Sequence, residues 1–432
     1  MSREGYPVYK QSGVSWLGAI PEHWEIRRLK YSADLINTKI DGASVDLPYT
    51  GLEHIESWTG KRISQNGDAT SEGQANLYGR GDVLFGKLRP YLAKAHAAAI
   101  DGICTGELLV LRPKAVKQKF LLNYVLNPDF VSIVDSSTYG AKMPRANWEF
   151  IGNLPALIPP MDEQQTIESF LEKETARIDA LIEKKQQQIE LLLEKRSALI
   201  SHAVTKGLDP DVKMKDSGVE WIGSIPAQWE VKRLKFVVSE PLKYGANEAA
   251  ELDDPELPRY IRITDVDENG RLRDETFKSI PEDVARPYLL KEGDLLLARS
   301  GATVGKSFYY EPSWGRAAYA GYLIRARFDP TKTMPRFINY FTNSQQYWQW
   351  LGSSFIQATI QNVSAEKYAN LIVPVPPFEE QKRIVSYLDS MWQRLNNMAD
   401  KVRQSIQILK EYRSALISAA VTGKIDVRKE VS

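Results

Sequence analysis

The 432-residue sequence contains a single cysteine, Cys104, and four histidines. One cysteine cannot form an internal disulfide bond or a cysteine-rich zinc site, and the histidines are not spaced like metal ligands. No apolar run approaches the roughly 18 residues that a membrane-spanning helix needs, and the start, Met-Ser-Arg-Glu-Gly, does not resemble a signal peptide. We therefore expect an intracellular, cytoplasmic protein without a metal site.

The sequence also lacks a large net charge of either sign and a recognisable catalytic motif. Its net charge is +1, so a nucleic-acid partner would require basic residues gathered on one face. Residues 301–307 have three residues between their glycines, whereas a phosphate-binding loop needs four. Residues 127–130 read Asn-Pro-Asp-Phe, which differs from the Asn-Pro-Pro-Tyr motif of adenine methyltransferases, and we interpret them as structural. We predict that this chain has no catalytic residue.

Glycine and proline are absent from residues 163–205, which predicts one continuous helix. Its apolar residues recur every 11 positions, in rows that begin at Ile167, Phe170 and Leu171. Because 11 residues in three turns is close to the natural period of an α-helix, the apolar stripe stays nearly straight or twists slightly right-handed. Such a stripe can pair with another helix over its whole length.

The same helix occurs a second time. Arg-Ser-Ala-Leu-Ile-Ser at 196–201 returns at 413–418, and Pro-Pro-x-x-Glu-Gln at 159–164 returns at 376–381, both displaced by 217 (413 − 196 and 376 − 159). A single stripe would most simply pack on its own domain, but two copies of equal length favour a pair, and a twofold relation makes that pair antiparallel. The predicted core of the helix pair is Ile167, Leu171, Ile178, Ile182, Ile189, Leu193, Ile200, Ile384, Leu388, Leu395, Ile406 and Ile417.

The segments before the two helices are also duplicated. Residues 13–31 return as 218–236, displaced by 205 (218 − 13), and their tryptophans, Trp16, Trp24, Trp221 and Trp229, are predicted core anchors. Each copy continues with short β-type runs, a helical segment and a proline-rich exit. We predict β structure at 48–55, 82–85, 103–111, 260–263, 294–298 and 321–328.

These repeats predict an α+β fold of two tandem mixed α/β domains separated by two long helices that form an antiparallel coiled coil. The expected boundaries are 1–158 for the first domain, 159–206 for the first helix, 207–375 for the second domain and 376–432 for the second helix with a polar tail.

Two kinds of loop could bind DNA. A basic loop follows each Gly-Asp-(Val/Leu)-Leu strand and suits phosphate oxygens or guanine edges; a polar loop precedes each exit and carries donors and acceptors for base edges. A solvated hairpin tip or an ordinary surface loop explains any single residue as well. The candidate residues are Lys87, Arg89, Tyr91, Lys94, Arg299, Ser300, Thr303 and Lys306 in the basic loops, and Tyr139, Lys142, Arg145, Asn147, Gln357, Thr359, Gln361 and Asn362 in the polar loops.

Taken together, the duplicated Trp-x-Gly-x-Ile-Pro-x-x-Trp opening, the Gly-Asp strand, the Glu-Gln helix entry and the Arg-Ser-Ala-Leu-Ile-Ser segment resemble the DNA-specificity subunit of Type I restriction-modification systems. The resemblance implies two target-recognition domains, each binding half of a bipartite double-stranded DNA site, held apart by conserved helices that set the spacer. It implies a non-catalytic subunit that docks two methyltransferase (modification) subunits and the restriction/motor subunits. The cofactors implied, S-adenosylmethionine, ATP and magnesium, belong to those partners.

Two other classes of function remain open from the residues alone. A helical scaffold that binds only proteins would have the same helices but no sequence-selective DNA binding. An autonomous DNA-modifying enzyme is disfavoured, because the sequence shows neither a cofactor motif nor a catalytic one.

Overall fold

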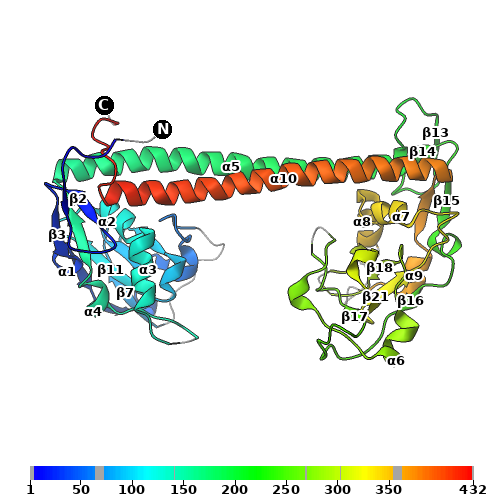
Figure 1. Cartoon of the computed structure of the whole chain (residues 1–432), viewed down its shortest axis with the longest axis horizontal. Helices are drawn as coiled ribbons and strands as arrows, with labels where there is room; N and C mark the ends of the chain where they lie inside the picture. Colours follow the sequence, from blue (N-terminus) through cyan, green and yellow to red (C-terminus); the bar gives the residue numbers. More distant parts are fainter. Residues whose placement is uncertain are drawn as a thin grey trace. The chain divides into compact units, whose positions relative to one another are not determined.

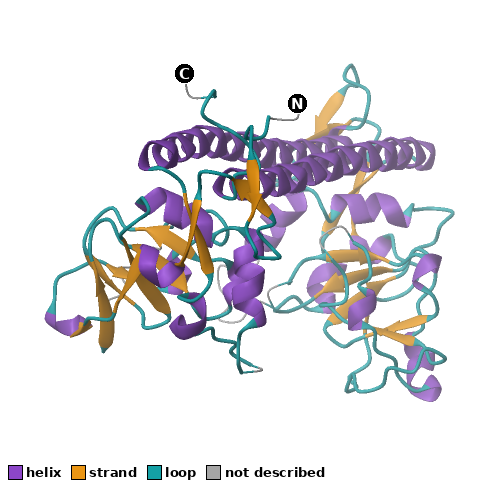
Figure 2. Cartoon of the chain, turned by 60° about the vertical axis from the view of Figure 1, so that its left-hand side comes forward, coloured by secondary structure: helices purple, strands orange, loops and turns teal. Residues whose placement is uncertain are grey.

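The computed structural model describes residues 4–63, 73–140, 142–267, 270–301, 303–353 and 362–430. The chain divides into two compact units (Figure 1). Unit 1 comprises residues 1–186 and 403–432, and unit 2 comprises residues 187–402. Each unit contains one globular domain and part of both long helices, and most strands lie in the globular parts (Figure 2).

The strands of unit 1 are β1 (Tyr9–Gln11), β2 (Ala19–Pro21), β3 (Glu25–Arg28), β4 (Ala33–Ile36), β5 (Lys39–Asp41), β6 (Tyr49–Thr50), β7 (Gln74–Tyr78), β8 (Val83–Gly86), β9 (Ala95–Ala97), β10 (Gly102–Cys104), β11 (Leu108–Pro113) and β12 (Pro155–Ile158). Its helices are α1 (Leu29–Ser32), α2 (Gln118–Val125), α3 (Pro128–Ser136), α4 (Trp148–Ile151), the first part of α5 (Met161–Lys206) and the last part of α10 (Phe378–Val421). Short 3-10 helices are η1 (Gly42–Ser44), η2 (Leu52–His54) and η3 (Pro90–Leu92).

The strands of unit 2 are β13 (Met214–Asp216), β14 (Ser224–Pro226), β15 (Glu230–Arg233), β16 (Lys243–Tyr244), β17 (Arg259–Ile261), β18 (Leu295–Ala298), β19 (Ser307–Tyr309), β20 (Ala317–Tyr319), β21 (Leu323–Ala326) and β22 (Ile372–Val375). Its helices are α6 (Glu282–Ala285), α7 (Pro335–Phe341), α8 (Gln345–Ser353), α9 (Ala365–Ala369) and the remaining parts of α5 and α10. Short 3-10 helices are η4 (Leu234–Phe236), η5 (Asp274–Thr276), η6 (Arg286–Tyr288) and η7 (Pro312–Trp314).

The main sheet of each unit is antiparallel and four-stranded, with the order β4-β11-β8-β9 in unit 1 and β16-β21-β18-β19 in unit 2. The proline-rich exits, predicted only as connections, form strands: β12 pairs with β3, and β22 pairs with β15. Proline is tolerated there because each sheet has only two strands, so both are edge strands. The second sheets of the globular domains differ: the described residues form the four-stranded order β5-β7-β10-β6 in unit 1 and the two-stranded pair β17-β20 in unit 2.

Two predicted β runs need correction. The run 103–111 is divided between β10 and β11, because a turn at 105–107 separates them. The run 48–55 is extended only at β6 and then turns into η2, where the backbone N–H of Gly51 donates to Nδ1 of His54 (3.0 Å). This local hydrogen bond closes a turn and ends the strand.

The aspartate of each Gly-Asp strand is buried and stabilises the sheet. Asp82 is 1% exposed and accepts hydrogen bonds from Nε of Arg112 (2.8 Å) and the backbone N–H of Gly79 (2.8 Å). Asp294, also 1% exposed, accepts hydrogen bonds from Nε of Arg327 (2.7 Å) and from the backbone N–H of Lys291 (2.8 Å). Because a buried carboxylate needs compensating partners, the motif joins two strands of each main sheet.

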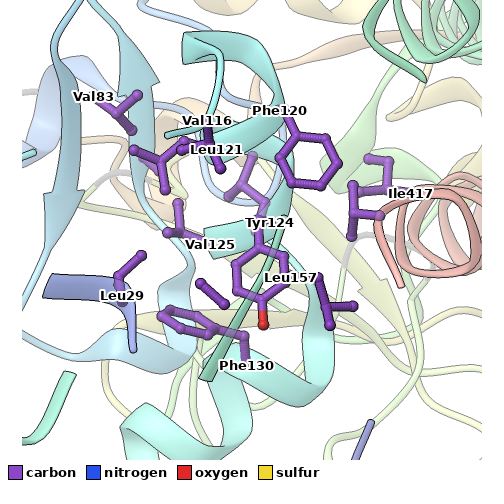
Figure 3. Close-up of a cluster of buried hydrophobic side chains, with 14 of the residues drawn as sticks. Leu29, Val83, Val116, Phe120, Leu121, Tyr124, Val125, Phe130, Leu157 and Ile417 are labelled. Atoms are coloured by element: carbon purple, nitrogen blue, oxygen red, sulfur yellow. The ribbon is translucent and has the colours of Figure 1, made fainter. Parts of the chain in front are cut away.

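In unit 1, the first part of α5 runs antiparallel to the last part of α10 (Figure 1). Ile167 and Ile178 of α5 and Ile417 of α10 belong to one buried cluster, which also contains the core of the globular domain. Figure 3 shows Ile417 beside that core, together with Phe120 and Tyr124 of α2. Nε of Arg413 donates to Oδ1 of Asp179 across the two helices (2.9 Å).

Unit 2 repeats this arrangement with its own parts of α5 and α10. Ile200 of α5 and Ile384 of α10 share a buried cluster. A guanidinium N–H of Arg196 donates to Oδ1 of Asn396 (3.1 Å). Arg196 corresponds to Arg413 of unit 1, and Asn396 corresponds to Asp179, because each pair of positions is separated by 217 (413 − 196 and 396 − 179). The arginine of Arg-Ser-Ala-Leu-Ile-Ser therefore links the two helices in each unit, and the predicted fold is confirmed.

The predicted core of the helix pair is wrong at Leu193, whose side chain is 38% exposed. Ile182 and Ile189 are half-buried, and the other predicted positions are buried. Leu193 belongs to the row that begins at Leu171, on the flank of the isoleucine stripe. A helix pair covers only a narrow stripe, so this flank is buried only where a globular domain also packs on the helix, as at Leu171 and Val204.

The Glu-Gln entry attaches the long helices to their domains. Oε1 of Gln164 accepts a hydrogen bond from the backbone N–H of Lys117, just before α2 (2.7 Å), and Oε1 of Gln381 accepts one from the backbone N–H of Met334, just before α7 (2.8 Å). Both glutamines are almost fully buried. Replacing either amide would leave a backbone N–H without its partner inside the protein.

The remaining structural predictions agree with the fold. Trp24 and Trp229 are fully buried, and Trp16 and Trp221 pack against the same cores. Asn127 caps α3 by accepting a hydrogen bond from the backbone N–H of Asp129 (2.9 Å), so residues 127–130 have a structural role. Within the described residues, no helix is both long enough and apolar enough to span a bilayer.

Candidate nucleic-acid interface

In unit 1, the predicted basic and polar loops lie against each other. We call residues 87–94, 137–140 and 142–147 platform 1. Leu88 and Arg145 form an antiparallel β-bridge. The backbone N–H of Arg89 donates to the carbonyl of Pro144 (2.8 Å), and that of Ala146 donates to the carbonyl of Lys87 (3.0 Å). Backbone hydrogen bonds thus join two loops that are distant in the sequence.

Unit 2 builds the same contact, which we call platform 2, from residues 299–301, 303–306 and 362–364. Ser300 and Asn362 form the bridge, and the backbone N–H of Val363 donates to the carbonyl of Arg299 (2.8 Å). The bridged residues stand 212 and 217 positions after their counterparts in unit 1 (300 − 88 and 362 − 145). The predicted residues Gln357, Thr359 and Gln361 lie outside the described residues.

Several predicted residues of platform 1 point into solvent. Tyr91 and Tyr139 are 47% and 62% exposed, and Arg89 and Lys142 are also exposed. Arg89 has a φ of 50°, a left-handed conformation that is uncommon for a residue other than glycine. Exposed aromatic rings and cations in joined loops match the chemistry of nucleic-acid contacts.

Arg145 is held by a carboxylate that the sequence analysis did not identify. Its Nε lies 3.1 Å from both carboxylate oxygens of Glu107, and a second guanidinium nitrogen lies 2.9 Å from Oε1. Hydrogen bonding to Glu107 raises the pKa of Arg145 above its ordinary value. Glu107 follows β10 in a turn, and no local pattern predicts that a loop some 40 residues later reaches it.

Two other predicted residues have structural partners. Nζ of Lys94 donates to the carbonyl of Leu52 (2.6 Å). Oδ1 of Asn147 accepts a hydrogen bond from the backbone N–H of Phe150 at the start of α4 (2.8 Å), and Ser364 caps α9 in the same way. Because Asn147 and Ser364 occupy equivalent positions, this cap belongs to the scaffold of both platforms.

In platform 2, the basic group is presented differently. The guanidinium carbon of Arg299 lies 4.8 Å from the ring centre of Tyr244, and its Nε donates to Oδ1 of Asn362 (3.3 Å). The hydroxyl of Tyr244 accepts a hydrogen bond from the backbone N–H of Ala365 (2.9 Å). Sequence reasoning missed Tyr244, because a two-residue strand gives no functional signal.

The other residues of platform 2 differ in exposure. Lys306 is exposed, whereas Ser300 and Thr303 are half-buried, and the hydroxyl of Thr303 has no hydrogen-bond partner in the described part of the chain. The two platforms therefore share their backbone contacts but not their side chains. Across the described ranges, no cluster of histidine, cysteine and carboxylate side chains could hold a metal ion.

The family model described as "Type I restriction modification DNA specificity domain" matches residues 21–191 and 226–407. The chain belongs to this family. The resemblance drawn from the sequence motifs is thereby confirmed, and both matched ranges include a platform that pairs a basic with a polar loop.

Individual relatives agree with the family assignment. The Type I restriction enzyme MjaVIII specificity subunit of Methanocaldococcus jannaschii is 24% identical over 445 residues, covering 95% of this chain and 94% of that protein. The EcoDI specificity subunit of Escherichia coli is 29% identical over 176 residues, covering 39% of each protein. A chain solved in work on complex assembly and conformational transition of the type I R-M system has the same fold, with a TM-score of 0.71, 19% identity and coverage of 93% of this chain and 98% of that chain.

Proposed function

We propose that this chain directs a Type I restriction-modification complex to a bipartite DNA site, and that each platform reads one half of it. The recognition domains are residues 1–158 and 207–375. The observation that supports this is the repeated contact between a basic and a polar loop, in which backbone hydrogen bonds recur and side chains differ. Recognition of two different half-sites requires different side chains on loops whose backbones are arranged in the same way.

Within each platform, we assign different tasks to the candidate residues. Arg89, Tyr91, Tyr139 and Lys142 are exposed and contact the DNA backbone or base edges. Arg145 and Arg299, which neighbouring side chains orient, read bases, since arginine is the commonest reader of guanine in the major groove. The side chains of Lys94 and Asn147 form hydrogen bonds with backbone groups of the protein and hold the loops in shape.

We further propose that residues 159–206 and 376–432, which contain α5 and α10, set the unread spacer between the half-sites. Support comes from the equal length of the two repeats and from the linkage of the helices by arginine in each unit. A continuous α-helix rises about 1.5 Å per residue, so the number of residues in the helix would set the distance between the two half-sites.

The complex works in the cytoplasm, and this chain acts in it without catalysis. It docks two methyltransferase subunits, which use S-adenosylmethionine, and the restriction subunits, which use ATP and magnesium. Support for two identical partners comes from exposed apolar side chains that recur 217 positions apart on the helices (398 − 181 and 408 − 191). Unit 1 exposes Leu181 (41%) and Ile408 (63%), and unit 2 exposes Leu191 (64%) and Met398 (42%). Exposed apolar groups on a charged helix favour contact with another protein.

The test is a map of adenine methylation in DNA from cells that make this chain with its methyltransferase subunit, compared with cells that make the methyltransferase alone. A two-part motif that requires this chain supports the proposal. Exchanging residues 139–148 should then change only the first half-site, and exchanging residues 353–364 only the second. A stable complex that adds no methylated motif would instead favour a scaffold that binds only proteins.

A further inference from the structure

Unit 2 contains a cavity of about 590 Å³ beside platform 2. Its walls come from residues 270–274, β19, α7, α8 and α10, and Lys306 of platform 2 lies on its rim. The volume falls within the range of about 300–1,000 Å³ that is typical of small-ligand sites. The cavity therefore has room for a ligand and adjoins the proposed DNA-contact surface.

Aromatic side chains form much of this wall. Tyr309, Trp314, Trp348 and Trp392 all line the cavity, and Trp348 is 43% exposed. Trp392 is held in place, because the guanidinium carbon of Arg196 lies 4.3 Å from its ring centre. Flat aromatic faces stack on any nucleobase, which makes such a wall tolerant of base identity.

Cations accompany the aromatic rings. Arg271 and Lys306 are exposed at the cavity, and neither forms an ion pair within the described part of the chain. Arg336 is already occupied, since its guanidinium lies 4.8 Å from the ring centre of Tyr309 and pairs with Glu311 (2.9 Å). Arg271 and Lys306 thus remain available for an anionic group such as a phosphate.

The equivalent cavity of unit 1 can be compared with this one, residue by residue. Its volume is about 1160 Å³. There, Ala97, Lys119, Leu122 and Thr175 replace Tyr309, Arg336, Asn339 and Trp392, at displacements of 212 (309 − 97) and 217 (336 − 119, 339 − 122 and 392 − 175). The duplicated scaffold thus keeps a cavity here without these four side chains, although Tyr309 and Trp392 also pack against the core of unit 2.

We propose that the cavity of unit 2 binds a single nucleotide, with its base against the aromatic wall and its phosphate at Arg271 and Lys306. The nucleotide is either free in solution or one that DNA bound to unit 2 releases from its base stack. This site goes beyond the proposed function, in which the platforms read stacked bases from the groove.

The first experimental arm measures binding of the four deoxynucleoside monophosphates to the full-length chain by calorimetry. Trp348→Ala should weaken binding about ten-fold or more, because it removes a stacking surface. Arg271→Gln should weaken binding of nucleotides but not of the corresponding nucleosides. Trp58→Ala is the matched control, since Trp58 lines the cavity of unit 1, is 37% exposed and should leave binding unchanged.

The second arm uses duplexes that carry 2-aminopurine at successive positions of the second half-site, bound to the complex of this chain with its methyltransferase subunit. If DNA supplies the nucleotide, fluorescence rises at one position with the wild-type chain and fails to rise with Trp348→Ala. A response in only one arm identifies the source. No response in either arm, or equal losses for Trp348→Ala and Trp58→Ala, overturns the proposal. The first arm needs no sequence-selective DNA binding, so its outcome is independent of the proposed function.

Discussion

Replacing Arg145 by alanine should impair DNA recognition far more than folding. Its backbone exchanges two hydrogen bonds with Tyr139 (3.1 Å each), and alanine retains both. The side chain loses its ion pair with Glu107, but Arg145 is 33% exposed, and an exposed ion pair contributes only about 0–1 kcal/mol to stability. A bidentate contact between arginine and a base contributes about 1–3 kcal/mol to discrimination, which corresponds to about 5- to 150-fold.

The assay compares methylation rates of DNA substrates that carry a single base change in either half-site. Arg145→Ala should reduce discrimination at one position of the first half-site and leave the second unchanged. Asn362→Ala, at the equivalent position of platform 2, is the matched control and should give the reverse. Undiminished discrimination in the first half-site, or a loss confined to the second, would refute the assignment of platform 1.

Four further perturbations test other parts of the argument. Glu107→Gln removes the carboxylate that neutralises Arg145, so DNA binding measured against salt should be tighter at low salt, with a log–log slope steeper by about 1; an unchanged slope would count against a phosphate or base contact. Asp294→Asn leaves the Arg327 side chain, which is 18% exposed, without its closest carboxylate but still paired with Glu240 (3.0 Å), and should lower the free energy of unfolding by about 1–3 kcal/mol in chemical denaturation; an unaltered midpoint would contradict this. Hydrogen bonding to Arg428 lowers the pKa of Asp426 below its ordinary value, so its stabilisation is present at neutral pH and lost as the pH falls through the lowered folded value. Hydrogen exchange at 422–430 should therefore rise in acid for the native chain, and should already be raised at neutral pH, with less dependence on pH, in Arg428→Ala; identical profiles for the two chains would contradict this. Deleting 11 residues from both helices shortens each by about 16 Å and should change the spacer by about 5 base pairs; retention of the original spacing in methylation maps would rule out this role of the helices.

The long helices were predictable because their signal is local and repeated. The absence of glycine and proline from 163–205 and the 11-residue period placed α5 within two residues of its observed ends, Met161 and Lys206. The exposure of Leu193 was not predictable in the same way, because burial on the flank of the stripe depends on which domain packs there. Periodicity gives the orientation of a side chain on its helix, but not the width of the surface that covers it.

The platforms were only half predictable. The basic and polar loops could be located from turn signals and from the duplication, but nothing local indicates that Leu88 meets Arg145. The orienting groups Glu107 and Tyr244 were missed for the same reason, since each acts on a residue distant in the sequence. The roles of Gln164 and Gln381 were likewise invisible, although their motif was recognised, because their partners are backbone groups before another helix.

The duplication explains how specificity can change without loss of the fold. In both platforms, the loops are joined by hydrogen bonds between backbone groups, which any residue except proline can donate. Leu88 can therefore be exchanged for Ser300, and Arg145 for Asn362, while the bridge persists. By contrast, the positions that both units keep, such as Asp82 and Asp294, supply buried carboxylates that accept hydrogen bonds from an arginine and from a backbone N–H in each main sheet. Variation is thus tolerated where the side chain is free to contact a ligand, and the constant residues are those on which the sheets and helices depend.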